Sequence, residues 1–79
     1  MALYYFHLCD GVDTLLDPDG REIADRSMIA GLAMQEARAI IGHEAIEGSI
    51  KFGQHIEVLD EAGAMIHRLD FRDAVTIRD

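Results

Sequence analysis

The stretch QHIEVLDEAGAMIHRLDF, residues 54–71, decides the fold. Its two apolar-rich runs, residues 54–59 and 64–71, flank the segment DEAG at residues 60–63. That segment is typical of a hairpin loop that is built on a type I turn and carries glycine in the left-handed conformation. We therefore predict a β-hairpin in which the two runs pair as antiparallel strands.

The register of this hairpin follows from the length of its loop. If Leu59 pairs with Ala64, alternate residues of the two strands share a face, because successive side chains of a strand point to opposite faces. The face that we predict to be the core then carries Gln54, Ile56, Val58, Met65, His67 and Leu69. The opposite face is mixed, with charged side chains beside Ile66.

A helix is predicted upstream of the hairpin, because apolar residues recur there with a period of 3.6. The apolar stripe consists of Ile29, Leu32, Ala33, Ala37, Ile40, Ile41 and Ala45. Asp25 or Ser27 can accept hydrogen bonds from the first free N–H groups, and Gly48 lies where a left-handed C-terminal cap belongs. The internal glycines, Gly31 and Gly42, indicate either the close approach of another backbone or defects that the helix tolerates.

Further strands are predicted on both sides of the helix. Residues 2–8 are rich in aromatic and apolar side chains and run into a turn signal at residues 9–11, so we predict a first strand there. Residues 13–17 precede a proline-glycine turn and form either a short strand or an ordered loop. Residues 75–77 are a candidate for a last short strand.

Length and element order together predict the fold class. A chain of 79 residues has room for one domain, which we place at residues 1–79. The expected fold is α+β: an antiparallel sheet of three to four strands with one long amphipathic helix packed on one face. The expected order of elements is β(β)αββ.

Charge and cysteine content indicate the cellular compartment and limit the classes of binding partner. Cys9 is the only cysteine, which argues against a disulfide framework and favours the cytoplasm. No apolar stretch approaches the ~20 residues that a membrane span needs. Seven Lys+Arg against 15 Asp+Glu give a formal charge of -8, which would repel the phosphate backbone of nucleic acids. We expect neither membrane nor nucleic acid as a partner, and a basic protein is a candidate.

The chain resembles the DUF6894 family. The resemblance rests on YYFHLCDG at residues 4–11, the DPDG turn at residues 17–20, the alanine-bearing helix, IEVLDEAG at residues 56–63 and FRDAV at residues 71–75. It implies a short cytoplasmic bacterial protein, of a kind seen mostly in rhizobia and related alphaproteobacteria, and it brings no assigned activity or catalytic residues. A proline commonly precedes the phenylalanine of the last strand in this family, and here that position is Asp70.

Metal-ligating and nucleophilic residues are present, but no motif orders them. Six carboxylates within residues 10–25 do not have the spacing of a calcium-binding loop, so we interpret them as turn and helix caps. His7 and Cys9 share one face of the first strand and are candidate zinc ligands, with His55 or His67 completing the set. In the absence of a phosphate loop or nucleophile elbow we assign no catalytic, cofactor-binding or metal-binding residues.

The clearest functional signal is association. One helix covers one face of a sheet, while the first strand is apolar on both faces. The candidate interaction surface is the uncovered apolar patch of Leu3, Tyr5, Leu59 and Ile66. The alternative is that residues 71–77 fold back over this face.

Three functions are compatible with these features. The favoured one is a small homodimerising module that binds or regulates another cytoplasmic protein through the second sheet face or an open strand edge. One alternative is a small metal- or thiol-dependent enzyme that uses His7, Cys9 and His67. The other is an antitoxin-like inhibitor of a basic protein, whose charge the acidic chain would complement.

Overall fold

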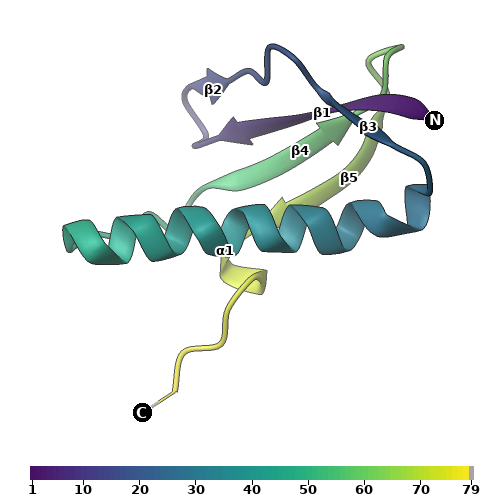
Figure 1. The fold of residues 1–79 in the computed structure, drawn as a ribbon. Helices are drawn as coiled ribbons and strands as arrows, with labels where there is room; N and C mark the ends of the chain where they lie inside the picture. Colours follow the sequence, from purple (N-terminus) through teal and green to yellow (C-terminus); the bar gives the residue numbers. More distant parts are fainter. Residues whose placement is uncertain (79) are drawn as a thin grey trace.

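The structure, a computed structural model, describes residues 1–78. Its strands are β1 (Ala2–Cys9), β2 (Thr14–Leu15), β3 (Arg21–Ile23), β4 (His55–Leu59) and β5 (Met65–Asp70), its helix is α1 (Ile29–Glu47), and its 3₁₀ turns are η1 (Arg26–Met28) and η2 (Phe71–Asp73). Figure 1 shows α1 lying across one face of an antiparallel sheet. The predicted α+β class is confirmed. The sheet has five strands: β2 lies within the predicted residues 13–17, whereas β3 was not predicted.

Strand β1 is at the centre of the sheet. Strand β4 pairs with one edge of β1, and β5 pairs with β4 beyond it. The two short strands share the other edge of β1, with β3 at the Ala2–Tyr4 end and β2 at the Leu8–Cys9 end. Between them the ladder is interrupted, and the carboxylate of Asp17 accepts a hydrogen bond from the Phe6 N–H at 3.2 Å. Asp17 therefore replaces the missing backbone acceptor.

The helix begins and ends close to the predicted residues. Asp25 caps η1, the turn that leads into α1, by accepting a hydrogen bond from the Ser27 N–H at 2.9 Å. Gly48 ends α1 in the left-handed conformation with φ of 91°. A Cβ at Gly31 or Gly42 would meet no atom within 4 Å. Both glycines are therefore tolerated defects rather than points of close backbone approach.

The core lies between α1 and the sheet. Its buried members are Tyr4, Phe6, Ile23, Ile29, Ala33, Ala37, Ile41, Ile56, Val58, Leu69, Phe71 and Ala74. The alternation of β1 places even-numbered residues toward the helix, and α1 contributes residues spaced four apart. The prediction that Ile56, Val58 and Leu69 lie in the core is confirmed.

The predicted hairpin register was wrong by one residue at Leu59 and by two residues along the rest of the strands. Asp60 Oδ1 accepts hydrogen bonds from the Ala62 and Ala64 N–H groups, so the loop closes at Asp60 and Leu59 pairs with Met65. A β-bulge then shifts the pairing by one more residue, and Val58 faces His67. Because the pairing is shifted by two residues in total, the remaining residues of both strands keep the faces that were predicted for them. Met65, however, is 55% exposed and is not a core residue.

The C-terminal segment packs on the helix side of the sheet. Phe71 and Ala74 are fully buried in the core, and the Arg38 Nε–H donates a hydrogen bond to the Ala74 carbonyl at 2.7 Å. The alternative in which residues 71–77 cover the second sheet face is therefore wrong, and residues 75–77 form no strand. Asp70 ends β5, and Phe71 opens η2.

Within residues 1–78, no helix is both long and apolar enough to cross a lipid bilayer.

Candidate functional site

The face of the sheet opposite α1, here called the open face, is the candidate site. It carries the odd-numbered residues of the two central strands together with two exposed residues of β5: Leu3, Tyr5, His7, Cys9, His55, Glu57, Leu59, Met65 and Arg68. The helix lies on the other side (Figure 1). Side chains on the open face must therefore be covered by one another, by the flanking loops or by a partner.

An apolar row crosses the open face at one end. Tyr5 pairs with Leu59, and Leu59 pairs with Met65. Tyr5 and Leu59 are half-buried, whereas Met65 is exposed. Leu3 lies two residues further along β1 on the same face, and its N–H donates to Glu61 Oε1 at 3.3 Å. Tyr5, Leu59 and Met65 are therefore apolar neighbours across three strands.

A charged row crosses the open face next to the apolar one. His7 pairs with Glu57, and Glu57 pairs with Arg68. At the β1 edge, the Asp17 N–H donates to His7 Nδ1 at 3.0 Å, which brings the Asp17 carboxyl to the end of the row. The row therefore carries a negative charge at one edge of the sheet and a positive charge at the other.

Burial raises the pKa of the Asp17 carboxyl, but hydrogen bonds from the N–H groups of Gly20, Phe6 and Asp19 outweigh this effect and hold the pKa below its usual value. The carboxylate therefore stays ionised at neutral pH. Its position is set by the same bonds that close the gap between β2 and β3.

A shallow groove of about 490 Å³ opens between the two loops that flank the apolar row. Tyr5, His7, Leu16, Asp17, Pro18, Leu59, Asp60, Glu61 and Gly63 line it. Aromatic and aliphatic side chains form its surface, and carboxylates stand in both flanking loops. The groove therefore combines an apolar floor with an acidic rim.

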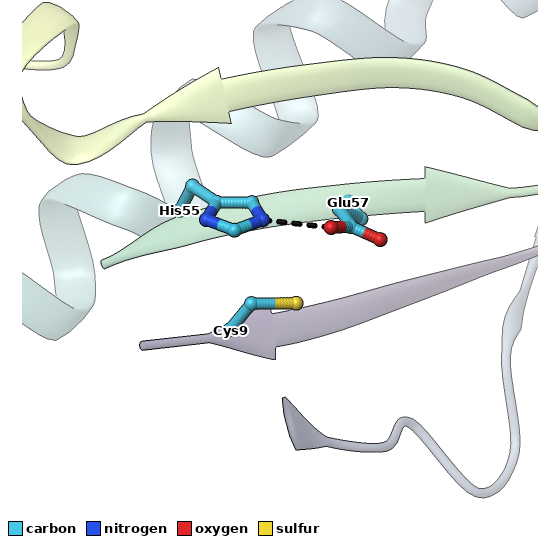
Figure 2. A group of neighbouring side chains, drawn as sticks. All are labelled: Cys9, His55 and Glu57. Atoms are coloured by element: carbon cyan, nitrogen blue, oxygen red, sulfur yellow. Dashed lines mark hydrogen bonds and ion pairs between the residues drawn. The ribbon is translucent and has the colours of Figure 1, made fainter. Parts of the chain in front are cut away.

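A cluster of three potential ligands lies at the other end of the open face. Figure 2 shows the side chains of Cys9, His55 and Glu57 converging from β1 and β4. One donor atom from each lies within 4.8 Å of the others, and His55 Nε2 is 2.7 Å from Glu57 Oε2. Cys9 and His55 are buried, with 6% and 9% of their surface exposed, and Glu57 is half-buried.

Hydrogen bonds within this cluster lower the pKa of Glu57 and hold the side chain of Cys9. The bond from His55 is the main cause of the lowered pKa of Glu57. Burial opposes it, and the charge on His55, a hydrogen bond from Cys9 and the charge of Arg68 lower the pKa further. The Thr14 hydroxyl lies 3.7 Å from Cys9 Sγ and donates to it. Glu57 is therefore an ionised carboxylate that contacts both of its neighbours.

The chain matches the model of a family described as Domain of unknown function (DUF6894) over residues 3–72. The chain belongs to the DUF6894 family. Neither the curated proteins nor the solved structures contain a match to it. The matched range holds α1, four of the five strands in full and all but the first residue of β1, so every open-face residue named above is part of the family domain.

The DUF6894 fold brings most of the predicted interaction surface together. Leu3, Tyr5 and Leu59 lie on the open face, as predicted. Ile66 is instead the extra residue of the β-bulge and packs against the core cluster. Met65 takes its place beside Leu59. The sequence pattern could not locate the bulge, because it depends on how the Asp60 carboxylate closes the loop.

The predicted metal ligands are only partly brought together. Cys9 and His55 lie side by side. His7 instead accepts a hydrogen bond from the Asp17 N–H, and His67 pairs with Val58 on the helix side of the sheet. His7, Cys9 and His67 therefore do not converge. Glu57 was missed as a ligand, although its spacing of two from His55 places both side chains on one face of a strand.

Three of the six carboxylates before α1 accept hydrogen bonds within their own turns. Asp10 Oδ1 accepts hydrogen bonds from the Val12 and Asp13 N–H groups at 3.0 and 2.7 Å. These two bonds hold the pKa of Asp10 below its usual value. Asp17 and Asp25 cap later turns in the same way. This use matches the interpretation of the carboxylates as caps.

Proposed function

We propose that this DUF6894 protein is a cytoplasmic homodimerising binding module in which the open faces of two copies pack against each other. The observation that carries the proposal is the self-complementary order of the apolar row that crosses the open face. The single cysteine, Cys9, supports the cytoplasm as the compartment, because secreted domains of this size commonly rely on disulfides.

The apolar row suits a two-fold axis parallel to the strands. Such an axis reverses the order of the strands in the second copy, so Leu59 of one copy packs on Leu59 of the other. Tyr5 then packs on Met65 of the second copy. Sheets that pack face to face lie about 10 Å apart, close to an aligned orientation. Every apolar side chain of the row thereby gains an apolar neighbour.

The same axis also determines which groups meet along the charged row. Asp17 lies at one edge of the row and Arg68 at the other. Because the axis runs over β4, Glu57 of one copy faces Glu57 of the other, and Arg68 of one copy faces His7 of the other, next to Asp17. The Glu57 pair is the like-charge contact along this row, and Arg68, whose charge lowers the pKa of Glu57 within each copy, offsets part of the repulsion.

The open face is just large enough for a specific interface between two copies. Strand β1 has eight residues, which span about 26 Å at ~3.3 Å per residue. Four strand positions about 4.8 Å apart give a face of roughly 500 Å² per copy, or roughly 1,000 Å² in total. That area reaches the lower bound of about 1,000 Å² for a specific protein–protein interface.

Sedimentation equilibrium tests the dimer. We expect the wild-type chain to be dimeric at about 100 μM and Tyr5→Glu to be monomeric, because the variant buries an unpaired charge at the interface. Met28→Glu is the matched control, since Met28 is as exposed as Met65 but lies in η1. A monomeric wild type, or equal dissociation by both substitutions, would overturn the proposal.

A basic protein partner is the second candidate, favoured by the acidic rim of the groove and the charge of -8. A binder of this kind would act as an antitoxin-like inhibitor. Fluorescence anisotropy with a labelled peptide rich in arginine and leucine tests it. This candidate predicts binding that Glu61→Gln and added salt both weaken, with Asp73→Asn as the control. Binding that neither change affects would exclude the groove as the site.

A further inference from the structure

We propose that Cys9, His55 and Glu57 form a binding site for Zn²⁺, with three protein ligands and one open coordination position. The site lies at the opposite end of the open face from the apolar row and does not depend on dimerisation. Its three donors come from neighbouring strands and converge on one point (Figure 2).

The strands fix the positions of the three donors. Cys9 and His55 are directly paired residues of β1 and β4, and Glu57 lies two residues along β4 on the same face. Paired residues of antiparallel strands have Cβ atoms about 4.5–5.5 Å apart, which lets their side chains meet over the sheet. The site is therefore built on regular strands rather than on loops, which favours precise geometry.

The donor spacing is close to that of a zinc site. Bonds of about 2.3 Å to sulfur and about 2.0–2.2 Å to nitrogen and oxygen place tetrahedral ligands roughly 3.2–3.7 Å apart. The three donors lie within 4.8 Å of one another, and the His55–Glu57 pair is 2.7 Å apart because the two side chains share a hydrogen bond. Small rotations of the side chains would separate this pair and draw Cys9 inward.

The donor types select the metal. A thiolate, an imidazole and a carboxylate suit a borderline ion such as Zn²⁺, whereas Ca²⁺ and Mg²⁺ require oxygen ligands. Three protein ligands leave the fourth tetrahedral position for water or an exogenous ligand. Binding releases the Cys9 thiol proton to solvent, and the neutral His55 ring binds the metal through Nε2 once its proton has moved to Nδ1.

Neighbouring groups support the ligands. The Thr14 hydroxyl donates to Cys9 Sγ and would orient the thiolate. Arg68 lies opposite Glu57 on the neighbouring strand, and its guanidinium donates a hydrogen bond to Asp70 Oδ1 at 3.0 Å. The Asp70 carboxylate therefore offsets part of the positive charge of Arg68 near the metal. Two anionic ligands, Cys9 and Glu57, neutralise a divalent cation.

Cobalt titration of the wild-type chain tests the site, because Co²⁺ replaces Zn²⁺ and is coloured. Cys9 is the only cysteine, so a thiolate-to-cobalt charge-transfer band in the near ultraviolet reports on Cys9 alone. We expect a band that saturates at one Co²⁺ per chain, is displaced by Zn²⁺ and is lost in Cys9→Ser. Absence of the band in the wild type would overturn the proposal.

Two further variants separate a three-ligand site from a lone thiol. His55→Gln and Glu57→Gln should each weaken cobalt binding by at least about tenfold, since even outer-shell changes cost 10–100-fold. His43→Gln is the matched control, because His43 forms an exposed pair with Glu47 at 2.9 Å. A band of undiminished affinity in both variants would contradict the assignment.

X-ray absorption of the zinc-loaded wild type decides the matter independently of how the variants fold. We expect one sulfur neighbour at about 2.3 Å and nitrogen or oxygen neighbours at about 2.0–2.1 Å. A zinc environment without sulfur would overturn the site. The same titration of Tyr5→Glu separates the two proposals, because the metal site should persist in a chain that no longer dimerises.

Discussion

The helix-covered face and the open face of the sheet are built from alternate residues of the same strands, yet they are closed to different degrees. On the helix side, Ile56, Val58 and Phe71 are almost completely buried. On the open side, Tyr5 and Leu59 keep part of their surface in solvent, and Met65 is mostly exposed. Folding of one chain thus buries the helix-covered face and leaves the apolar row of the open face partly in solvent.

The largest expected effect is on the helix-covered face. Phe71→Ala should lower the free energy of unfolding by about 3–5 kcal/mol, because it leaves a cavity where a fully buried ring packed. Urea denaturation of the variant measures this loss. Met65→Ala, on the open face, should change the stability of the monomeric chain by less than about 0.5 kcal/mol. Equal losses would mean that the two faces contribute alike to folding.

A smaller effect is expected at the edge where the two faces meet. Asp17→Ala should cost about 2 kcal/mol, because three backbone N–H groups lose their acceptor. The lowered pKa of Asp17 means that its contribution is complete above the ordinary value of 3.8 and is lost as pH falls through the lower folded-state pKa. The stability difference between wild type and variant, measured from pH 7 downward, should therefore shrink only below about pH 4. A difference that shrinks already near neutral pH would point to another group.

An increase in stability is expected on the outer side of the helix. Gly42→Ala should raise the free energy of unfolding by about 1 kcal/mol, because the position is helical and an added Cβ meets open space. Gly20→Ala is the contrasting variant, since Gly20 has φ of 71° and a Cβ there would lie 3.0 Å from the Tyr4 carbonyl oxygen. Thermal denaturation that ranks the two variants in the reverse order would contradict this difference.

The smallest effect on folding is expected on the open face itself. Leu59→Ala should change the unfolding free energy by less than about 1 kcal/mol when measured at a concentration where the chain is monomeric. At high concentration the same variant should unfold earlier than wild type, because it loses dimer contacts as well. Unfolding measured at a series of protein concentrations separates the loss of stability within one chain from the loss of dimer contacts. A concentration-independent difference would place the role of Leu59 entirely within one chain.

The sequence predicts those parts of the fold that depend on local patterns. The hairpin, the helix and the glycine cap at Gly48 follow from periodicity and turn chemistry, and all are present. The hairpin register and the split between β2 and β3 do not follow, because each depends on one carboxylate. Asp60 widens the loop, and Asp17 replaces a ladder partner of Phe6. Such side-chain bonds leave no periodic trace in a sequence.

The residues of the candidate sites likewise fall into those that local sequence patterns predict and those that they do not. Alternation along β1 places Leu3, Tyr5 and Cys9 on one face without any knowledge of tertiary structure. The cluster with His55, in contrast, requires the register between β1 and β4, whose residues are far apart in the chain. Glu57 could have been added from its spacing alone once His55 was placed on the open face.

Photo-cross-linking gives the most direct test of the claim that the open face is closed by a second copy. We would place p-benzoyl-phenylalanine at Tyr5 on the open face and, as the control, at Met28 in η1, both in the otherwise wild-type chain. The account predicts a covalent dimer on irradiation for position 5 and only monomer for position 28. Dimers of equal yield from both positions, or none from position 5, would contradict it.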